Sequence, residues 1–551
     1  MSSVSTPSVS SRSRRHLAQG LVALITALAP ASAFAAFGLT TSSTQYTVDT
    51  GGGLVFKVDR ANGNIPSIAW NGTELNDTAK PSGIASGLGS TGTTVSAVTS
   101  GSNIIVTVAT NSSNGVAAGL TQYYVVQSGV NNIYMATHVT NEPTVGELRW
   151  ITRLQSGQFN SFPANSNNTG NTGAIESSDV FGYANGTSTS KYYGNQRARD
   201  LTIRGITGSG KGVFMAYGNR ESSSGGPFFR DIQNQTGTDA EVYNYMNSGH
   251  QQTEAWRMGL QGPYALCFTT GSTPSVPDMS FMANLGLTGY VASAGRGRVI
   301  LNGLAGRDTA YAYTVAFDNT TAQYWTTAAA SNGSAGCYNM KPGTYTMTVY
   351  KGELEVYTES VTVTAGNPTT LNTRTIAADP SATTALWRIG NWDGTPLEFR
   401  NGANISLMHP SDTRQGSWTP GTYTVGSSSA SSFPACQWKD INGTQTVSFT
   451  LTAAQVAAHT VRVGITAAYA GARPKIAVNS WSSSNPSAST QPDSRSITIG
   501  SYRGNNTTYT FSVPASAFVT GTNTLTLVPI SGSGSTAYLS AGYALDCVDL
   551  Y

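Results

Sequence analysis

Residues 345–363, with the sequence YTMTVYKGELEVYTESVTV, show most clearly which kind of fold the chain adopts. On both sides of Lys351-Gly352, β-branched and aromatic residues alternate with polar ones in approximate period two. This alternation is typical of half-buried strands, and the Lys-Gly step between them indicates a hairpin turn. Similar patterns recur along the chain, and only the Ala-rich residues 451–459 favour helix, of up to about two turns. The sequence therefore predicts an all-β protein.

The composition is poor in charge for a chain of 551 residues, because Asp, Glu, Lys and Arg make up only 11% of it. Soluble globular domains usually contain about 25% of these residues. With 39% hydrophobic residues and 60 glycines, the composition excludes a charge-rich disordered chain and a coiled coil. The formal net charge of +3 excludes a strongly basic nucleic-acid binder, so we expect no nucleic-acid partner.

The first 35 residues have the features of a secretory signal peptide. Arg14 and Arg15 precede an apolar run, and residues 33–35 (AFA) resemble the small-residue site at which signal peptides are cleaved. An N-terminal membrane anchor is the alternative, but Pro30 interrupts the run before it reaches the roughly 18 apolar residues that a span needs. We therefore expect residues 1–35 to be removed and the mature protein to be secreted and extracellular, with no membrane partner.

Changes in local amino-acid composition indicate where the rest of the chain divides into domains. The apolar residues 281–287 give way to a glycine-rich stretch near residue 288, and a second change occurs near residue 378. The middle block has the length of a small β-sandwich, and the last block would suit a jelly roll, a form common among sugar-binding modules. We expect three domains, at residues 36–287, 288–378 and 379–551.

Four cysteines are too few for a disulfide scaffold, and none belongs to a C-x-x-C motif for zinc or redox chemistry. Cys436 and Cys547 lie in strand-like segments of the last predicted domain and could pair, whereas Cys267 and Cys337 are predicted to be buried thiols. The histidines after the leader are too scattered to indicate a metal cluster. We expect neither a metal nor a cofactor.

Paired acids occur at Asp239 and Glu241, where they would share one face of a strand. In a chain built of strands and turns, such acids are usually solvated. The two carboxylates of a glycoside hydrolase need to meet only in space, so acids far apart in sequence can form its active site. A two-carboxylate glycoside hydrolase is therefore one open interpretation.

Tyrosines and charged residues concentrate in three stretches of the first predicted domain, residues 190–193 (SKYY), 222–231 and 243–264, and further motifs lie in the other two domains. Together they make the chain resemble the rhamnogalacturonan lyases of polysaccharide lyase family 4, from residues 36–38 to residues 546–549. The motifs are residues 146–149 (GELR), 222–231 (SSSGGPFFRD), 245–254 (YMNSGHQQTE), 341–346 (KPGTYT), 389–394 (IGNWDG) and 408–412 (MHPSD). The resemblance implies a large mutarotase-like β-sandwich, a fibronectin-III-like β-sandwich, and a C-terminal jelly roll resembling a carbohydrate-binding module.

The activity that the resemblance implies is that of a rhamnogalacturonan endolyase. Such an enzyme cleaves the bond between rhamnose and O4 of galacturonate in the pectin polysaccharide rhamnogalacturonan I, by β-elimination and without water. By motif, Lys191 corresponds to the family's base and His250 to its acid, although the sequence leaves an exchange of these roles open. A histidine with a pKa near its usual value of about 6.5 donates a proton at mildly acidic pH.

Five further residues would bind the substrate by resemblance. Arg149 would lie beside the substrate carboxylate, where a cation stabilises the enolate-like transition state. Tyr243 and Tyr245 would line the cleft, although tyrosines two apart on a strand share a face and could belong to the core instead. Arg230 and Glu254 lie in the matched motifs and would have binding or supporting roles.

One further function stays open, that of a non-catalytic pectin-binding protein. It would keep the binding residues and the polysaccharide partner without cleaving the backbone. Nothing in the sequence indicates oligomerisation, so we expect a monomer.

Overall fold

The computed structural model describes residues 36–551, except for residues 90, 251–253, 489–495, 502–504 and 532–533. The predicted signal peptide, residues 1–35, lies outside the described residues. Strands dominate, and the single α-helix among the described residues is the four-residue α1 (Ser496–Ile499). The predicted all-β class is confirmed. In the part of the chain that the structure describes, no helix is long and apolar enough to cross a membrane.

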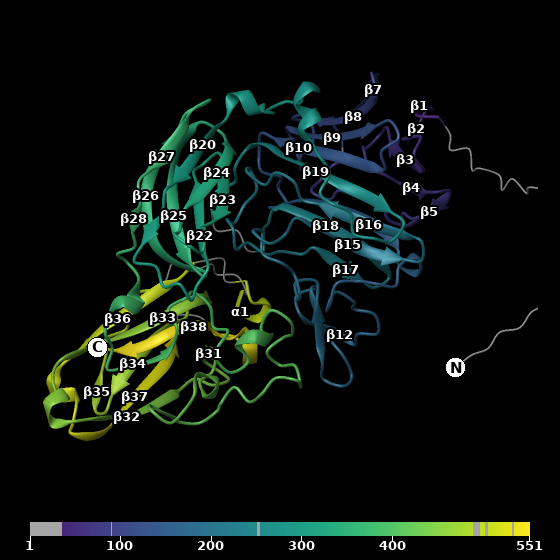
Figure 1. Cartoon of the computed structure of the whole chain (residues 1–551). Helices are drawn as coiled ribbons and strands as arrows, with labels where there is room; N and C mark the ends of the chain where they lie inside the picture. The colour runs from purple at the N-terminus through teal and green to yellow at the C-terminus, as the bar shows by residue number, and fades with distance from the viewer. Residues whose placement is uncertain (1–35, 90, 251–253, 489–495, 502–504, 532–533) are drawn as a thin grey trace, which may run out of the picture.

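Figure 1 shows three groups of sheets that follow one another along the chain. The first group contains a seven-stranded sheet of order β15–β16–β19–β10–β9–β8–β7. Its strands are β7 (Thr93–Ser100), β8 (Asn103–Thr110), β9 (Leu120–Gln127), β10 (Asn132–Val139), β15 (Ile203–Gly208), β16 (Lys211–Ala216) and β19 (Gly259–Thr269). All of these neighbours pair antiparallel.

Two further sheets complete the sandwich of the first group. A five-stranded meander consists of β1 (Gly38–Thr41), β2 (Gln45–Asp49), β3 (Leu54–Asp59), β4 (Ser67–Trp70) and β5 (Thr73–Glu74). A four-stranded sheet of order β17–β18–β11–β6 consists of β6 (Gly83–Ile84), β11 (Leu148–Gln155), β17 (Asn234–Thr236) and β18 (Asp239–Asn247).

One hydrophobic core packs a face of the seven-stranded sheet against these two sheets. In β8, Ile104 and Val106 point into this core, whereas Ile105 belongs to a second cluster on the opposite face. Period-two alternation produces this division. Apolar residues between 279 and 287 cover the opposite face. Both faces of the sheet are therefore buried, which explains the nearly continuous apolar sequence of β8.

Strands β11 and β18 carry three of the predicted site residues. They pair antiparallel, with Arg149 opposite Tyr245 and Ile151 opposite Tyr243. Trp150 points into the core of the first group, whereas Ile151 packs with the two tyrosines in a separate cluster. Because successive side chains of a strand point to opposite faces, Arg149 lies on the outer face with Tyr243 and Tyr245.

A small sheet extends from the first group toward the third (Figure 1). It consists of β12 (Gly173–Glu176), β13 (Val180–Gly182) and β14 (Ser188–Ser190). Strands β13 and β14 pair antiparallel, and Lys191 follows β14 directly. This extension is therefore what carries the predicted base.

The second group is a β-sandwich with sheets of order β23–β22–β25–β26 and β24–β20–β27, beside the pair β21–β28. The opening stretch forms the predicted hairpin, with a turn at Gly352, whose φ of +59° favours glycine. The strands are β20 (Gly297–Leu301), β21 (Leu304–Ala305), β22 (Tyr313–Asp318), β23 (Gln323–Thr327), β24 (Ala335–Met340), β25 (Gly343–Lys351), β26 (Leu354–Val363), β27 (Pro368–Leu371) and β28 (Arg374–Thr375).

The third group stacks two sheets over a core rich in aromatic residues. One sheet has the order β29–β38–β33–β36, with β31 also paired to β38, and the other has the order β30–β32–β37–β34–β35. The strands are β29 (Trp387–Gly390), β30 (Tyr423–Thr424), β31 (Cys436–Trp438), β32 (Gln445–Leu451), β33 (His459–Tyr469), β34 (Arg473–Val478), β35 (Trp481–Ser482), β36 (Thr507–Val513), β37 (Gly521–Ile530) and β38 (Gly542–Leu550).

The helix predicted at residues 451–459 is wrong in extent. Only Ala453–Gln455 are helical, as a 3-10 turn, because β32 ends at Leu451 and β33 begins at His459. Thr452 and Gln455 form a capping box around this turn, and Val456 is already extended. The short connection between two paired strands leaves no room for a second turn.

The possible Cys436–Cys547 disulfide is also wrong, since all four cysteines are free and buried. Cys436 lies opposite Ala544 on β38, and Cys547 lies three residues further along that strand. An odd separation puts side chains on opposite faces. Accordingly, Cys436 packs in the core of the third group, whereas Cys547 packs in that of the second group. The predicted buried thiols at Cys267 and Cys337 are confirmed.

Candidate active site

Arg149 lies on the outer face of the four-stranded sheet, where a tyrosine hydroxyl and a carboxylate contact its guanidinium. Its Nη1 donates a hydrogen bond of 2.6 Å to the Tyr245 hydroxyl and lies 2.6 Å from Oε2 of Glu147. The guanidinium carbon also lies 5.6 Å from the centre of the Tyr245 ring. Arg149 keeps 30% of its side chain exposed, so it is oriented by these contacts and still accessible to a ligand.

Tyr243 and Tyr245 stand side by side on β18, with stacked rings 6.0 Å apart. Burial raises the pKa of both hydroxyls well above the usual value, so both stay protonated. Tyr243 donates its hydroxyl hydrogen to Glu241. The two tyrosines are thus partly core, as the sequence left open, but Tyr245 also orients Arg149.

His250 lies against the same aromatic cluster. Its ring centre is 5.7 Å from that of Tyr192 and 5.8 Å from that of Tyr245. Its Nε2 lies 3.2 Å from Oε1 of Glu147, and its Nδ1 lies 3.6 Å from Oδ1 of Asp231. Glu147 therefore contacts both Arg149 and His250.

The protonation of His250 differs from the sequence expectation. Burial by itself lowers the pKa of this imidazole, but the negative charges of Asp231, Glu147 and Asp179 outweigh burial and raise the pKa to about 9. The residue is therefore an imidazolium at neutral pH. With 28% of its side chain exposed, it can give a proton to a bound molecule.

Lys191 forms an ion pair with Asp179, whose Oδ1 lies 2.9 Å from Nζ. Both side chains are 20% exposed. Asp179 also contributes to the raised pKa of His250, and the charge of Lys191 acts on the pKa of Glu241. The β14 extension therefore brings Lys191 to the cluster of Arg149, Tyr245 and His250, which comes from β11, β18 and the residues after β18.

The expectation that Asp239 and Glu241 are solvated is wrong. Their exposed fractions are only 2% and 6%. Glu241 accepts the hydrogen bond from Tyr243 and lies 3.3 Å from Nε of Arg153, and Asp239 lies 3.0 Å from Nζ of Lys80. Burial and the neighbouring Asp239 raise the pKa of Glu241. These acids support the sheet beneath the cluster.

Arg230 and Glu254 are placed toward the second group of sheets. Arg230 is buried, and its charge acts on the pKa of the buried Glu353. Glu254 accepts a hydrogen bond from the backbone nitrogen of Gly225 and lines a cavity of about 210 Å³ together with Asp318. Their contacts therefore favour a supporting role for both residues at this junction.

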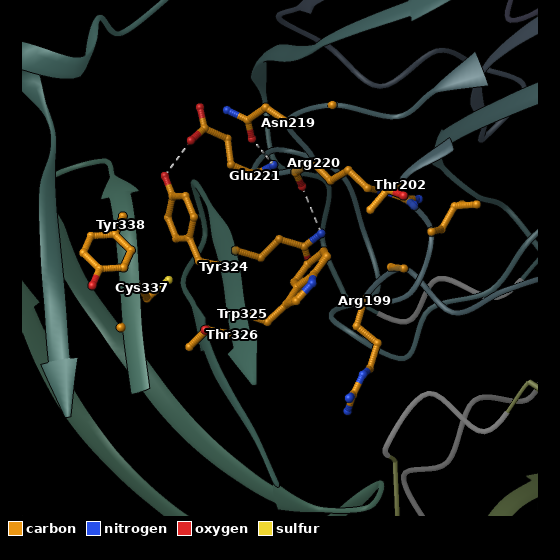
Figure 2. A pocket seen from close by; sticks show the side chains of 15 residues that line it. Arg199, Thr202, Asn219, Arg220, Glu221, Tyr324, Trp325, Thr326, Cys337 and Tyr338 are labelled. Atoms are coloured by element: carbon orange, nitrogen blue, oxygen red, sulfur yellow. Dashed lines mark hydrogen bonds between the residues drawn. The ribbon is translucent and has the colours of Figure 1, made fainter. Parts of the chain in front are cut away.

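A larger cavity, of about 440 Å³, lies at another part of the junction and is shown in Figure 2. Tyr324 donates a 2.6 Å hydrogen bond to Glu221, which is paired with Arg296 at 2.6 Å and Lys341 at 3.1 Å. Burial would raise the pKa of Glu221, but these partners lower it to about 2. Among the described residues that line this cavity, none belongs to the predicted site.

The sequence did not single out Glu147, Asp179 or Asp231 as individual site residues. Glu147 stands two positions before Arg149 in a quoted motif, and Asp231 ends another quoted motif. Membership of these motifs is therefore the sequence feature that could have identified both carboxylates as site residues. Asp179 lies in no quoted motif. Within the described part of the chain, no group of three or more His, Cys, Asp or Glu side chains is arranged to hold a metal ion.

Three family models match the chain, one over each of the three groups of sheets. Residues 37–289 match the family model described as rhamnogalacturonan lyase B, N-terminal. Residues 295–371 and 385–550 match the models of polysaccharide lyase family 4, domain II and domain III. The three matches together extend over most of the chain.

Relatives match over nearly their whole length. Rhamnogalacturonate lyase A of Aspergillus aculeatus is 47% identical over 525 residues, which cover 94% of this chain and 97% of the relative. Rhamnogalacturonate lyase A of Emericella nidulans is 46% identical over 94% of this chain and 96% of the relative. A probable rhamnogalacturonate lyase A of Aspergillus fumigatus is also 46% identical, with the same coverage.

Proposed function

The chain belongs to polysaccharide lyase family 4, and from this membership we propose that it is a secreted rhamnogalacturonan endolyase acting as a monomer. The substrate is the backbone of rhamnogalacturonan I, a pectin polysaccharide. The enzyme cleaves its rhamnose-(1→4)-galacturonate bonds by β-elimination. The products are a chain that ends in rhamnose and a chain whose new non-reducing end is a 4,5-unsaturated galacturonate.

Recognition of the galacturonate carboxylate falls to Arg149. Its guanidinium is held from one side by Glu147 and Tyr245 and is partly exposed, as a binding cation must be. A cation at this carboxylate stabilises the negative charge that spreads into it when C5 loses its proton. Arg149 thus acts on the transition state more than on the ground state.

Lys191 is the base that takes the C5 proton. It must first be a neutral amine, and Asp179 at 2.9 Å is the hydrogen-bond partner that can take its proton. When a bound polysaccharide excludes water, burial disfavours the separated charges of the ion pair relative to the neutral pair. The electrons of the C5–H bond then form the C4=C5 double bond as the C4–O4 bond breaks.

His250 is the acid that protonates the departing glycosidic oxygen. The observation that carries this proposal is the surrounding of His250 by carboxylates, which raises its pKa to about 9 and keeps a proton on the ring at neutral pH. A donor that is already protonated suits the acid role better than the base role. Proton transfers of this kind contribute roughly 10²- to 10⁴-fold to a rate.

The direct test is incubation of the purified mature protein, residues 36–551, with rhamnogalacturonan I. We expect the polymer to shorten while ultraviolet absorbance from the new C4=C5 double bond rises in proportion to the bonds cleaved. Cleavage without that absorbance would contradict the proposal and favour a glycoside hydrolase. Binding to the polymer without cleavage would contradict it in favour of a pectin-binding protein.

A further inference from the structure

The segment that carries Lys191 is held by the third group of sheets at both of its ends. At its start, the backbone nitrogen of Thr413 donates to the carbonyl oxygen of Gly186 at 3.1 Å. At its end, the backbone nitrogen of Gly194 donates to the carbonyl oxygen of Ser406 at 3.0 Å. Lys191 lies between these anchors, so a loop from a distant part of the chain restrains the segment of the proposed base.

Ser188, three residues before Lys191, is the point at which the restraint is strongest. Its backbone nitrogen and its hydroxyl donate to Oδ2 of Asp412 at 2.6 and 2.8 Å. Its hydroxyl oxygen also accepts from the backbone nitrogen of His409 at 2.9 Å, and its carbonyl oxygen accepts from Arg414 at 3.2 Å. Every polar group of this buried serine therefore contacts residues 409–414.

Asp412 is itself rigidly held. Arg414 donates to both carboxylate oxygens, at 2.8 and 2.7 Å, in the forked geometry that makes such pairs strong. Burial would raise the pKa of Asp412, but the hydrogen bonds from Arg414 and Ser188 lower it to about 2. The carboxylate is therefore charged at neutral pH, where it accepts both hydrogen bonds from Ser188.

The restraint passes from Ser188 to the base along β14. Ser190, the last residue of that strand, donates its hydroxyl hydrogen to the carbonyl oxygen of Asp179 at 2.8 Å. The backbone nitrogen of Lys191 donates to the same oxygen at 3.3 Å. The separation of the Lys191 amine from its partner carboxylate therefore depends on where β14 lies.

Residues in α1 and just after it also contact the surroundings of the site. The Tyr193 hydroxyl donates to the carbonyl oxygen of Thr498 at 3.0 Å, and Ile499 packs in one cluster with Tyr243 and Tyr245. Ser501 donates its hydroxyl hydrogen to the carbonyl oxygen of Arg230 at 3.4 Å, next to the aspartate that contacts His250. The third group of sheets thus contacts the surroundings of both proposed catalytic residues.

We propose that Asp412 is a positioning residue for the lyase reaction, which through Ser188 fixes β14 and with it the base Lys191. The third group of sheets, in this view, completes the active site in addition to any contact that it makes with the polysaccharide. The inference rests on the proposed function, because it takes Lys191 as the base. It also accounts for the MHPSD motif, which the reaction itself leaves unexplained.

The test compares Asp412→Asn and Ser188→Ala with the unchanged enzyme on rhamnogalacturonan I, well below the melting temperature of each variant. Misplacing a catalytic group by about 1 Å can cost about 10²-fold in rate. We expect Asp412→Asn to lower kcat by roughly 10- to 100-fold with KM within about threefold, and Ser188→Ala to lower kcat less. In a Lys191→Ala background, Asp412→Asn should add no further loss, because both changes act on one group.

Asp379→Asn is the matched control. Asp379 likewise accepts hydrogen bonds from the backbone and hydroxyl of one serine, Ser381, and from one cation, Lys351, but at a different junction. Lys351 is buried, whereas Arg414 is half exposed, so the control variant disturbs its pair at least as strongly. We expect it to lower the melting temperature and leave kcat nearly unchanged. An equal loss of kcat in this control would overturn the inference by showing a merely structural effect.

The outcomes separate the two proposals. If Lys191→Ala is inactive while Ser188→Ala and Asp412→Asn keep kcat within twofold of the unchanged enzyme, the positioning role is wrong and the proposed function stands. If Lys191→Ala keeps its activity, the proposed base is wrong and this inference falls with it. Ser188→Ala removes a single oxygen, so it tests the inference even if Asp412→Asn does not fold.

Discussion

Lys191 and Asp179 contact each other twice, through an Nζ–Oδ1 ion pair of 2.9 Å and through a 3.3 Å hydrogen bond from the Lys191 backbone to the Asp179 carbonyl oxygen. The aspartate immediately precedes β13, and the lysine immediately follows β14. Because these two strands pair with each other, the small sheet fixes both residues together. A proposed base and the acceptor for its proton therefore belong to one hairpin.

Replacing the proposed base should remove most of the activity. We expect Lys191→Ala to lower kcat by about 10²- to 10⁴-fold, because no other amine takes the C5 proton. The measurement is the initial rate of ultraviolet absorbance with rhamnogalacturonan I at saturating concentration. Activity within tenfold of the unchanged enzyme would exclude Lys191 as the base.

Lys211→Ala is the control for this variant. Lys211 lies at the start of β16, and its amine donates to the side chain of Gln158. Like Lys191, it is a partly buried lysine of the first group. Its replacement by alanine therefore also removes one positive charge from that group, but away from the proposed site. We expect its kcat to stay within about twofold of that of the unchanged enzyme.

The pH dependence should report the raised pKa of His250. Because the acid must be protonated, kcat is expected to fall as the pH rises through about 9, where His250 loses its proton. Asp231→Asn removes one of the charges that stabilise the imidazolium, so the alkaline fall should begin about one pH unit lower. Identical alkaline limbs in the two enzymes would contradict the role of His250 as the acid.

Nuclear magnetic resonance titration of the histidine rings gives an independent reading. His250 should titrate above its ordinary range in the unchanged protein and closer to it in Asp231→Asn. His138, whose pKa is lowered by burial, is the internal control. Its titration should be the same in both proteins, because the effect of Asp231 is local.

Much of this site could be expected from local pattern. Period two places Glu241, Tyr243 and Tyr245 on one face of a strand, and the structure has them on one face of β18. The pattern does not reveal that other segments cover this face at Glu241, so it predicts a solvated carboxylate where the structure has a buried one. The burial of this face depends on which other segments pack against it, and the sequence of a single strand does not indicate those segments.

The contacts around Lys191 show where sequence reasoning stops. Ser188 and Asp412 are 224 positions apart, and neither residue type nor spacing indicates that they meet. The same holds for Tyr193 and Thr498, which are 305 positions apart. Of these four residues, only Asp412 lies in a quoted motif, and the contacts are set by how the third group packs on the first. Long-range pairs of this kind need the structure.

The two neighbouring tyrosines should respond differently to loss of the hydroxyl. Tyr245→Phe removes the acceptor that orients Arg149, so we expect KM for rhamnogalacturonan I to rise several-fold, by about 1 kcal/mol of lost binding. Tyr243→Phe instead leaves the buried Glu241 without its hydrogen bond, which should lower stability by about 1–3 kcal/mol with little change in KM. Steady-state kinetics and urea denaturation separate the two effects. Equal changes in both variants would show that Tyr245 does not act through Arg149.

The stability of the third group should depend on Asp549. This fully buried carboxylate lies 3.0 Å from Arg388 and 2.6 Å from Arg462, and it accepts a hydrogen bond from the indole of Trp392 at 3.1 Å. Asp549→Ala leaves these cations without their shared partner. Removal of one member of a buried pair costs about 3–5 kcal/mol, because the remaining charge is uncompensated.

The measurement for this last prediction is the free energy of unfolding in urea, with Glu359→Gln as the control. Glu359 pairs with Arg374 at 2.8 Å, but both side chains keep more than a fifth of their surface exposed, so water already screens the pair. The control should cost no more than about 1 kcal/mol. A loss in Asp549→Ala as small as that of the control would mean that water or another group reaches the two arginines. In that case the two ion pairs of Asp549 would contribute little to the stability of the β29–β38–β33 sheet.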